Sequence, residues 1–337
     1  MPKKTGSPTI RDVAKMAGVS ITTVSRAINQ SSNSIATETL ERINKAIAEL
    51  SFVPHIAARN LSSSRKNAIG LLLPRIGWDD YFPPLLRGVE TGAVENGFDL
   101  LIASRRFNAP NGHRAVGPHN TDGVVIFTDS LSDEEIALWH KQNFPCVLLH
   151  RTPPNGLNIP HVQYENKDGA RKVIDHLIEV HHCKRIGFLS GPHGNEDSFW
   201  REAGYRSALE AHGLQVESSL IAAGNFEESD ARKAVESWLA NGIEMDAIFA
   251  GDDDSAIGAI LALQNAGKRV PENVAVVGFD DAPFARFCNP PLTTVKASID
   301  DAGQRATQML AELITKGETE SMALLPTELV IRKSCGC

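Results

Sequence analysis

TIRDVAKMAGVSITTVSRAIN, residues 9–29, has the pattern of two short helices joined by a tight turn. Thr9 followed by Asp12 is typical of a capped helix start, with a hydroxyl for the free amides and an acid in the first turn. Apolar residues then recur with helical spacing at Ile10, Val13, Ala14 and Ala17. We expect Gly18 to end this helix and Ser20 to cap the next one.

The second helix has two unlike faces. Val24 and Ile28 point to one side, and the other side carries Ile21, Thr22, Ser25, Arg26 and Asn29. Hydroxyls and a guanidinium without any acid suit the major groove of DNA, where they meet base edges and phosphates. A small helical bundle with a solvated polar face has the same periodicity, so periodicity alone leaves both interpretations open. A third helix follows, with an apolar face of Leu40, Ile43, Ile47 and Leu50.

The charge of the chain is unevenly distributed. Residues 1–66 hold ten Lys and Arg but four Asp and Glu, a charge of +6. The whole chain of 337 residues carries −7, so the remainder carries −13. A basic head on an acidic body favours binding of a polyanion by the head alone.

Cysteine usage and the N-terminal sequence predict a cytoplasmic protein. The five cysteines are odd in number and mostly far apart, at Cys146, Cys183, Cys288, Cys335 and Cys337. The N-terminus lacks the pattern of a signal peptide, and no apolar run reaches membrane-spanning length. His181–Cys183 and Cys335–Cys337 resemble metal-binding clusters, but neither has the paired spacing of a structural zinc site. We therefore predict no metal and no cofactor.

From residue 68 short apolar runs alternate with amphipathic helices. The runs lie at 69–74, 100–103, 123–127, 146–150, 185–190, 247–251 and 274–279. The helices are expected at 85–96, 132–141, 168–179, 198–212, 229–240 and 254–266, with a last one at 302–316. Continuous apolar strands between helices indicate parallel sheets covered on both faces. The count exceeds one ordinary sheet, so we predict an α/β body of two doubly wound lobes with a cleft between them.

Residue identities add a resemblance. DVAKMAGVSITTVSRAIN at 12–29 and FVPHIAARNL at 52–61 resemble the LacI/GalR family of bacterial transcription regulators, and the likeness covers nearly the whole chain. It implies a helix-turn-helix head, a hinge helix that pairs in a homodimer on palindromic operator DNA, and a leucine, Leu61, that wedges into the minor groove. The implied DNA-binding residues are Thr9, Ser20, Ile21, Thr22, Thr23, Ser25, Arg26, Asn29, His55, Ala58 and Leu61.

The resemblance also implies a division of the chain. The head would span 1–53, and the hinge and linker 54–66. The N-terminal lobe would comprise 67–163 plus 298–325, and the C-terminal lobe 164–297 plus 326–337. The chain would then cross between the lobes near Tyr164, Lys296 and Pro326, as in periplasmic sugar-binding proteins. After the strand near 329–331 only RKSCGC remains, with no heptad tail to build a tetramer, so we expect a dimer.

Polar and aromatic residues at the ends of the apolar runs match the family's effector site. They are Tyr81, Phe82, Asp129, Glu165, Asn195, Asp197, Arg201, Phe226, Asp252 and Asp280. Carboxylates that accept hydroxyl hydrogens, with one Arg and an aromatic wall, describe a site for a neutral polyol. A sugar or sugar derivative is our first choice of effector, and a nucleobase or nucleoside the second. Asp168 and Asp254 are interpreted as helix N-caps.

The sequence departs from the family at three places. Ala36 stands where the third helix usually has a capping side chain, so Thr37 or Ser34 would cap instead. Asp252 replaces the common Asn, which disfavours an acidic or phosphorylated effector. Residues 104–122 are rich in Pro and Gly, so we expect the usual helix there to be missing or reduced to a turn.

Two other classes of protein compete with a ligand-responsive regulator, which we expect to be a repressor. An enzyme could use the three acids at 252–254 to hold magnesium. However, the chain has no phosphate-cradling Gly-rich loop, no G-x-S-x-G elbow and no His/Cys nucleophile arrangement. A solute-binding protein of transport type would share the two-lobed body, but the basic helical head argues against it.

Overall fold

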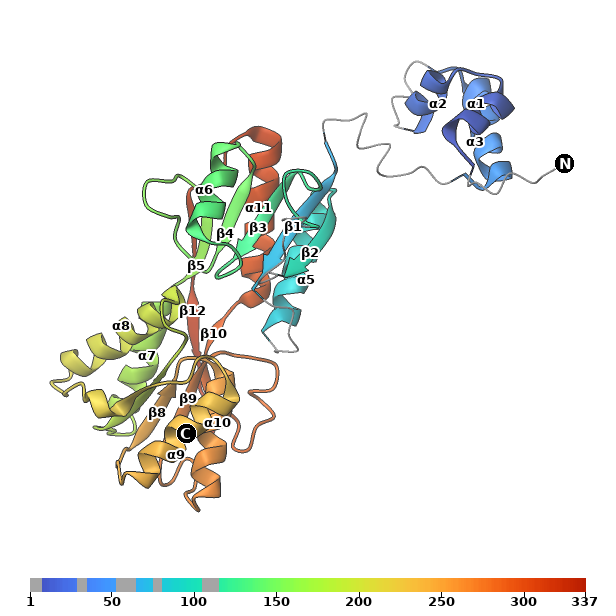
Figure 1. Ribbon diagram of the computed structural model, residues 1–337. Coiled ribbons are helices and arrows are strands. Elements are labelled where there is room, and N and C mark those ends of the chain that lie inside the picture. Colours follow the sequence, from blue (N-terminus) through green and yellow to red (C-terminus); the bar gives the residue numbers. More distant parts are fainter. Residues whose placement is uncertain (1–7, 29–34, 53–64, 75–80, 105–114) are drawn as a thin grey trace. The chain divides into compact units, whose positions relative to one another are not determined.

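The computed structural model describes residues 8–28, 35–52, 65–74, 81–104 and 115–337. The chain forms two compact units, residues 1–66 and residues 67–337 (Figure 1). Four of the predicted DNA-binding residues, Asn29, His55, Ala58 and Leu61, lie outside the described residues.

In the described part of the first unit there are three helices: α1 (Ile10–Ala17), α2 (Ile21–Ile28) and α3 (Thr37–Leu50). The predicted start and end of α1 are confirmed. The Thr9 amide donates to the Asp12 carboxylate over 2.9 Å, and Gly18 adopts the left-handed conformation with φ 65°. Ser20 caps α2 by accepting the Thr23 amide over 3.1 Å. The core between the helices is made of Val13, Ala14, Ala17, Val24, Ile43, Ala46 and Phe52.

The start of α3 differs from the prediction. Ala36 occupies the cap position, and no side chain caps the helix there. Thr37 is the first helical residue rather than the cap, and Ser34 lies outside the described residues. Packing of the buried Ile43 and Ala46 against α1 and α2 holds the helix instead.

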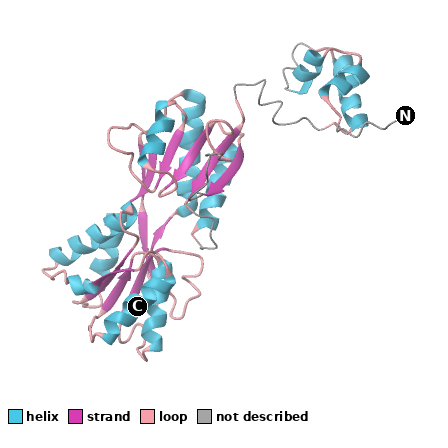
Figure 2. Ribbon diagram, viewed as in Figure 1, coloured by secondary structure: helices cyan, strands magenta, loops and turns pink. Residues whose placement is uncertain are grey.

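The second unit contains two sheets (Figure 2). The first has the order β11-β5-β4-β3-β1-β2 and is entirely parallel. Its strands are β1 (Ala68–Leu73), β2 (Asp99–Ser104), β3 (Gly123–Phe127), β4 (Cys146–Leu149), β5 (His161–Tyr164) and β11 (Met322–Leu325). With helices α5 (Phe82–Glu95), α6 (Asp133–Lys141) and α11 (Ile299–Lys316) this sheet makes what we call the first lobe.

The second sheet has the order β12-β10-β9-β8-β6-β7, parallel except for the antiparallel edge strand β12. Its strands are β6 (Ile186–Ser190), β7 (Ile221–Ala223), β8 (Ala247–Ala250), β9 (Ala275–Asp280), β10 (Thr293–Ala297) and β12 (Thr327–Val330). Helices α7 (Asn166–Glu179), α8 (Glu196–Ala211), α9 (Glu228–Ala240) and α10 (Asp253–Asn265) complete the second lobe. Two parallel-sheet lobes behind a helical head confirm the predicted fold class.

Helices cover both faces of each sheet. In the first lobe α5 and α11 pack on one face and α6 on the other. In the second lobe α7 and α8 share one face, and α9 and α10 the other. The core under α5 and α11 continues into the core under α7 and α8, so one apolar cluster spans both lobes. Central strands such as β1 and β9 are buried along their whole length, which explains their continuous apolar sequence.

The chain passes between the lobes three times: after β5, after β10, and between β11 and β12. These points fall at or beside Tyr164, Lys296 and Pro326. In Figure 1, β10 and β12 lie side by side where the chain crosses, and they are hydrogen-bonded to each other. After β10 the chain returns to the first sheet to add β11, and then to the second sheet to add β12. Each sheet is therefore completed by a strand from the C-terminal part of the chain.

The segment after β2 forms turns at 115–122, and Val116 there is fully buried against the first sheet. The remaining residues, 105–114, lie outside the described residues, so the predicted loss of a helix is tested only in part. Among the described helices none combines the length and hydrophobicity needed to span a bilayer.

Gly88 allows α5 and α11 to pack closely. A Cβ atom at Gly88 would lie 1.9 Å from the carbonyl oxygen of Asp300. We expect Gly88→Ala to lower the free energy of unfolding by about 3 kcal/mol, because overpacking outweighs the roughly 1 kcal/mol that alanine gains in a helix. The measurement is urea unfolding followed by tryptophan fluorescence, since all four tryptophans follow residue 67. Glu90→Ala, on the exposed side of α5, is the control and should change stability by no more than about 0.5 kcal/mol. Equal urea midpoints for the two variants would show that α5 and α11 can move apart without loss of stability.

Candidate ligand site and DNA-binding face

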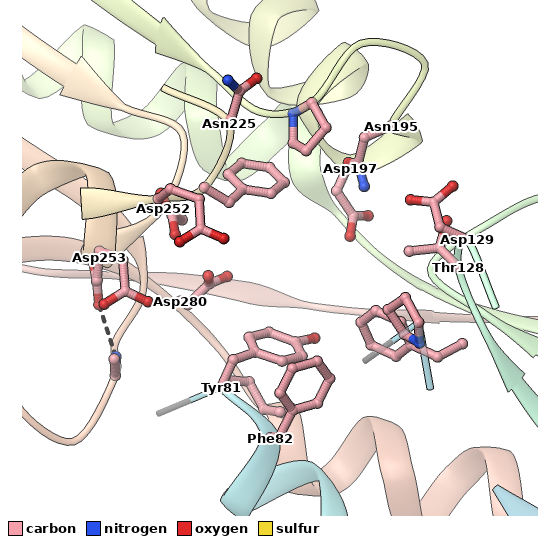
Figure 3. Close-up of a pocket in the computed structure, with 18 of the residues that line it drawn as sticks. Tyr81, Phe82, Thr128, Asp129, Asn195, Asp197, Asn225, Asp252, Asp253 and Asp280 are labelled. Atoms are coloured by element: carbon pink, nitrogen blue, oxygen red, sulfur yellow. Dashed lines mark hydrogen bonds between the residues drawn. The ribbon is translucent and has the colours of Figure 1, made fainter. Parts of the chain in front are cut away.

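A cavity of about 370 Å³ lies where the carboxyl ends of strands from both lobes meet (Figure 3). It is lined by Pro74, Tyr81, Phe82, Phe127, Thr128, Asp129, Pro192, Asn195, Asp197, Arg201, Asn225, Phe226, Glu227, Asp252, Asp253, Asp254, Asp280, Ala282 and Ile299. Nine of the ten predicted effector residues are among them, so the cavity brings together what the sequence places up to 200 positions apart. This is the position in which open α/β sheets bind their ligands.

Glu165 is the exception. It is not among the residues that line the cavity. It stands immediately before α7 at the first crossing, where its amide donates to the carbonyl of Leu325 over 2.9 Å. Its carbonyl accepts a hydrogen bond from the Thr327 hydroxyl over 3.3 Å. Glu165 therefore joins two of the crossings through its backbone.

Arg201, on α8, is the central cation of the site and is only 3% exposed. Its Nε donates to Asn166 Oδ1 over 2.9 Å, Nη1 donates to the carbonyl of Gly251, and Nη2 donates to Asp280 Oδ1 over 3.1 Å. The plane of the guanidinium stacks on the Phe279 ring, with Cζ 3.8 Å from the ring centroid. Each of the three guanidinium nitrogens thus donates a hydrogen bond, which fixes the position of Arg201 in the cavity wall.

Buried carboxylates surround this cation. Burial raises the pKa of Asp280 to about 7, because desolvation and the carboxylates of Asp252 and Asp197 outweigh the attraction of Arg201. Burial, followed by the proximity of Asp280, also raises the pKa of Asp253 well above its usual value. One guanidinium cannot compensate all of these acids, so the site holds protons that an unfolded chain would release.

Asp197 behaves differently. Its burial would raise its pKa, but His150, Arg201 and a hydrogen bond from Asn166 lower it, with a net decrease. The Asn166 amide donates to Asp197 Oδ1 over 2.8 Å, and His150 Nδ1 lies 3.3 Å from Asp197 Oδ2. The neighbouring His150, Arg201 and Asn166 thus favour the ionised form of Asp197.

The three consecutive acids at the start of α10 have separate roles. Asp252 caps α10 by accepting the Ser255 amide over 3.1 Å, so the prediction that Asp254 is the cap is wrong. Asp253, which the sequence analysis left out of the site, accepts the Ala282 amide over 2.7 Å, drawn as a dashed line in Figure 3. It also accepts the Thr294 hydroxyl over 2.6 Å. Asp253 thus holds the loop that follows Asp280.

Aromatic rings form the opposite wall. Tyr81 and Phe82 come from the start of α5 and pack against Phe127, Tyr81 edge-on with centroids 5.9 Å apart and Phe82 tilted with centroids 5.8 Å apart. Phe226, from the loop before α9, lies 5.6 Å from the guanidinium carbon of Arg201. Figure 3 shows Tyr81 and Phe82 facing the acids across the cavity. Apolar ring faces opposite hydrogen-bonding groups are typical of small-molecule sites.

His150 is a residue that the sequence analysis missed. It follows β4, is fully buried, and lies 2.8 Å from the Tyr81 hydroxyl through Nε2. Through Nδ1 it faces Asp197, so it connects the first lobe to the second. A second link lies beside it, where Glu196 accepts hydrogen bonds from the Thr152 amide and hydroxyl over 2.8 and 2.7 Å. Because His150 ends an ordinary apolar strand, local sequence gave no signal for this role.

In the first unit α2 presents the predicted face. Ile21, Thr22 and Arg26 are exposed, and Thr23 and Ser25 are half-buried. Thr9 and Ser20 are engaged as helix caps, and the Ser20 hydroxyl lies 2.8 Å from that of Thr23. No acidic residue occurs in the sequence of α2. The face is thus basic and hydroxyl-bearing, with an exposed isoleucine beside the polar groups.

Comparisons with known proteins agree with both halves of this geometry. The family model of the bacterial regulatory proteins of the lacI family matches residues 9–55, and that of the periplasmic binding protein-like domain matches residues 174–335. The ribose operon repressor of Halalkalibacterium halodurans is 34% identical, over 97% of this chain and 96% of the relative. The transcriptional repressor PurR of Pasteurella multocida is 31% identical, over 97% and 98%.

Solved structures give the same result. The Lac repressor dimer bound to operator and the anti-inducer ONPF has a TM-score of 0.86 at 26% identity, over 98% of this chain and 99% of that one. The complex of the transcriptional regulator CelR with cellobiose has a TM-score of 0.72 at 30% identity, over 97% and 99%. With a helix-turn-helix head and a two-lobed body around a cavity, the chain belongs to the LacI family of transcriptional regulators, which bind operator DNA and a small effector and are not enzymes.

Proposed function

We propose that this regulator is a homodimeric repressor whose affinity for a palindromic operator is switched by a neutral polyhydroxylated effector, a sugar or sugar derivative. The observation that carries the proposal is the ring of buried carboxylates around Arg201, opposite an aromatic wall. Carboxylates accept hydrogen bonds from paired hydroxyls, and a fixed guanidinium donates to a ring or hydroxyl oxygen. The aromatic faces provide apolar contact for a sugar ring.

The charge balance of the cavity supports a neutral effector. Among the described residues, its lining includes six aspartates and glutamates beyond Asp280 but a single cation, Arg201. A phosphorylated or carboxylated ligand would meet strong repulsion in so acidic a site. A nucleobase or nucleoside is the alternative, since the rings of Tyr81, Phe82 and Phe226 could also stack on a planar base. The relatives do not decide between the two, because ribose, cellobiose and purine regulators are similarly distant.

The contacts between the lobes suggest how the effector acts. A ligand that hydrogen-bonds to Asp197 and Arg201 competes with the contact between Asp197 and His150, which joins the lobes. The first lobe begins at Ala68, directly after the linker from the head. We propose that the ligand changes the position of residues 67–163 plus 298–325 relative to the rest of the body. The hinge at 54–66 would transmit this change to the DNA-binding head. We also propose that the regulator acts in the cytoplasm.

The effector class is tested by thermal unfolding of the full chain with ribose, cellobiose, glucose, adenosine and guanine. A sugar at about one hundred times its dissociation constant should add about 2.7 kcal/mol and raise the Tm by about 5 °C. Asp280→Asn is the matched control, because asparagine tolerates positive φ and still accepts a hydrogen bond from Arg201. The Tm of this variant should not respond to the sugar. A response to adenosine or guanine alone would establish the alternative, and an undiminished response in the variant would place the ligand elsewhere.

Stability should depend on pH through Asp280. Between pH about 4 and about 7 the folded chain keeps a proton on Asp280 that the unfolded chain has released. The folded state then binds more protons, so the free energy of unfolding falls as pH rises through this window and is level above it. Relative to Asp280→Asn, the free energy of unfolding of wild type should fall by roughly 4 kcal/mol across the window. This is the free-energy equivalent of a pKa raised from 3.8 to about 7. Denaturant unfolding by tryptophan fluorescence measures this difference, and parallel pH profiles would refute it.

A further inference from the structure

Four metal-binding side chains meet at the C-terminus of the chain. His176 lies in the last turn of α7, His181 lies just beyond that helix, and Cys335 and Cys337 end the chain. The sulfur and nitrogen atoms that they offer all lie within 4.8 Å of one another. The cluster is separate from the ligand cavity, since His176 stands ten residues, or about 15 Å along α7, from Asn166 at the other end. His181 of the first sequence cluster and both cysteines of the second therefore form one group in space, with His176 added.

The spacing within the group matches a tetrahedral ion. His176 Nε2 lies 3.7 Å from Cys335 Sγ and 3.6 Å from Cys337 Sγ, and His181 Nε2 lies 3.4 Å from Cys337 Sγ. With Zn–S bonds of about 2.3 Å and Zn–N bonds of about 2.0–2.1 Å, sulfur and nitrogen at tetrahedral angles are separated by about 3.6 Å. The measured distances scatter around this value. The two imidazoles have centroids 5.0 Å apart and an interplanar angle of 76°, so both edges reach the same point.

The surrounding structure holds the sulfurs in place. The backbone of Ser334 pairs with that of Val276, its carbonyl accepting the Val276 amide over 2.9 Å. The Thr293 hydroxyl donates to Cys335 Sγ over 3.1 Å, the kind of outer contact that stabilises a metal-bound thiolate. Gly336 has φ 109°, and a Cβ there would lie 3.2 Å from His181 Nδ1. Glycine between the cysteines thus lets both sulfurs turn toward the histidines.

The chemistry of the four groups selects the ion. Two thiolates and two imidazoles suit Zn²⁺, whereas Mg²⁺ and Ca²⁺ require oxygen ligands. We propose that His176, His181, Cys335 and Cys337 bind one Zn²⁺ ion in a tetrahedral site that fastens the C-terminus to the end of α7.

The test uses the full chain, reduced and stripped of metal with EDTA, and titrated with Co²⁺. Binding should produce thiolate-to-cobalt charge transfer in the near ultraviolet and the visible absorption of tetrahedral cobalt, saturating at one ion per chain. Zn²⁺ should displace the cobalt, since its affinity for such ligands is higher. Saturation with Zn²⁺ should also raise the Tm of the chain.

Matched variants identify the ligands. Cys337→Ser and His181→Asn should each weaken cobalt binding at least tenfold and remove the gain in Tm. Both positions are at or near the surface, and far-ultraviolet circular dichroism checks that each variant is folded. His182→Asn and Cys288→Ser, which change a neighbouring histidine and a distant cysteine, should bind Co²⁺ as wild type does. Asparagine accepts the positive φ of His182.

Three results would overturn the site. The reduced chain could take up Co²⁺ without charge transfer, which would exclude thiolate ligands. The ligand variants could bind as tightly as the controls, which would indicate scattered surface binding. The chain could instead resist metal and carry a disulfide between Cys335 and Cys337, seen as a mass lower by two hydrogens that reduction restores without any gain in cobalt binding.

Discussion

The body of the protein depends on one buried guanidinium. Arg201 holds the carboxylate of Asp280, the amide of Asn166 and the carbonyl of Gly251, and it stacks on a ring at the end of a central strand. Without this cation the carboxylates around it would be buried and uncompensated, a loss of about 3–5 kcal/mol for one pair alone. The charges in this arrangement are not balanced, because the acids among the described lining residues outnumber the one cation. A ligand with hydroxyl donors would hydrogen-bond to these acids, which is why we propose a polyhydroxylated effector for the site.

The three crossings place this site where it can act as a switch. Sheets of both lobes direct the carboxyl ends of their strands toward the cavity, and α7 and α8 begin beside it with Asn166 and Asp197. His150 reaches the site from the first lobe, where it meets Tyr81, and its Nδ1 lies 3.3 Å from Asp197 of the second lobe, so groups from both lobes meet at the site. We propose that a ligand that rearranges these contacts changes the relation of the lobes, a differential interaction of the kind that allosteric control requires.

Local sequence signals made the fold predictable, whereas contacts between residues far apart in the sequence limited how much of the site could be predicted. Thr9, Gly18 and Ser20 mark helix ends by chemistry within a few residues, and central strands are recognisable because both faces are buried. The short strands β5, β7 and β11 were not predicted, because β5 alternates buried and half-buried residues and the edge strands β7 and β11 are half-exposed. The likeness to the family predicted nine residues that line the cavity, and it also predicted Glu165, which does not line it. It gave no sign of His150, whose role arises from partners 69 and 47 positions away in the sequence. A single sequence does not show which residues come into contact over such separations.

The most direct test of the account is the linkage between effector and DNA. A duplex selected for binding by this chain is labelled and titrated with protein by fluorescence anisotropy, with and without a saturating amount of the sugar that stabilises the body. In wild type the sugar should change the Kd for the duplex by about fivefold or more. In Asp280→Asn the duplex should still bind, and the sugar should leave its Kd unchanged. An unchanged Kd in wild type, with the sugar demonstrably bound, would contradict the claim that the Arg201 site controls the helix-turn-helix head.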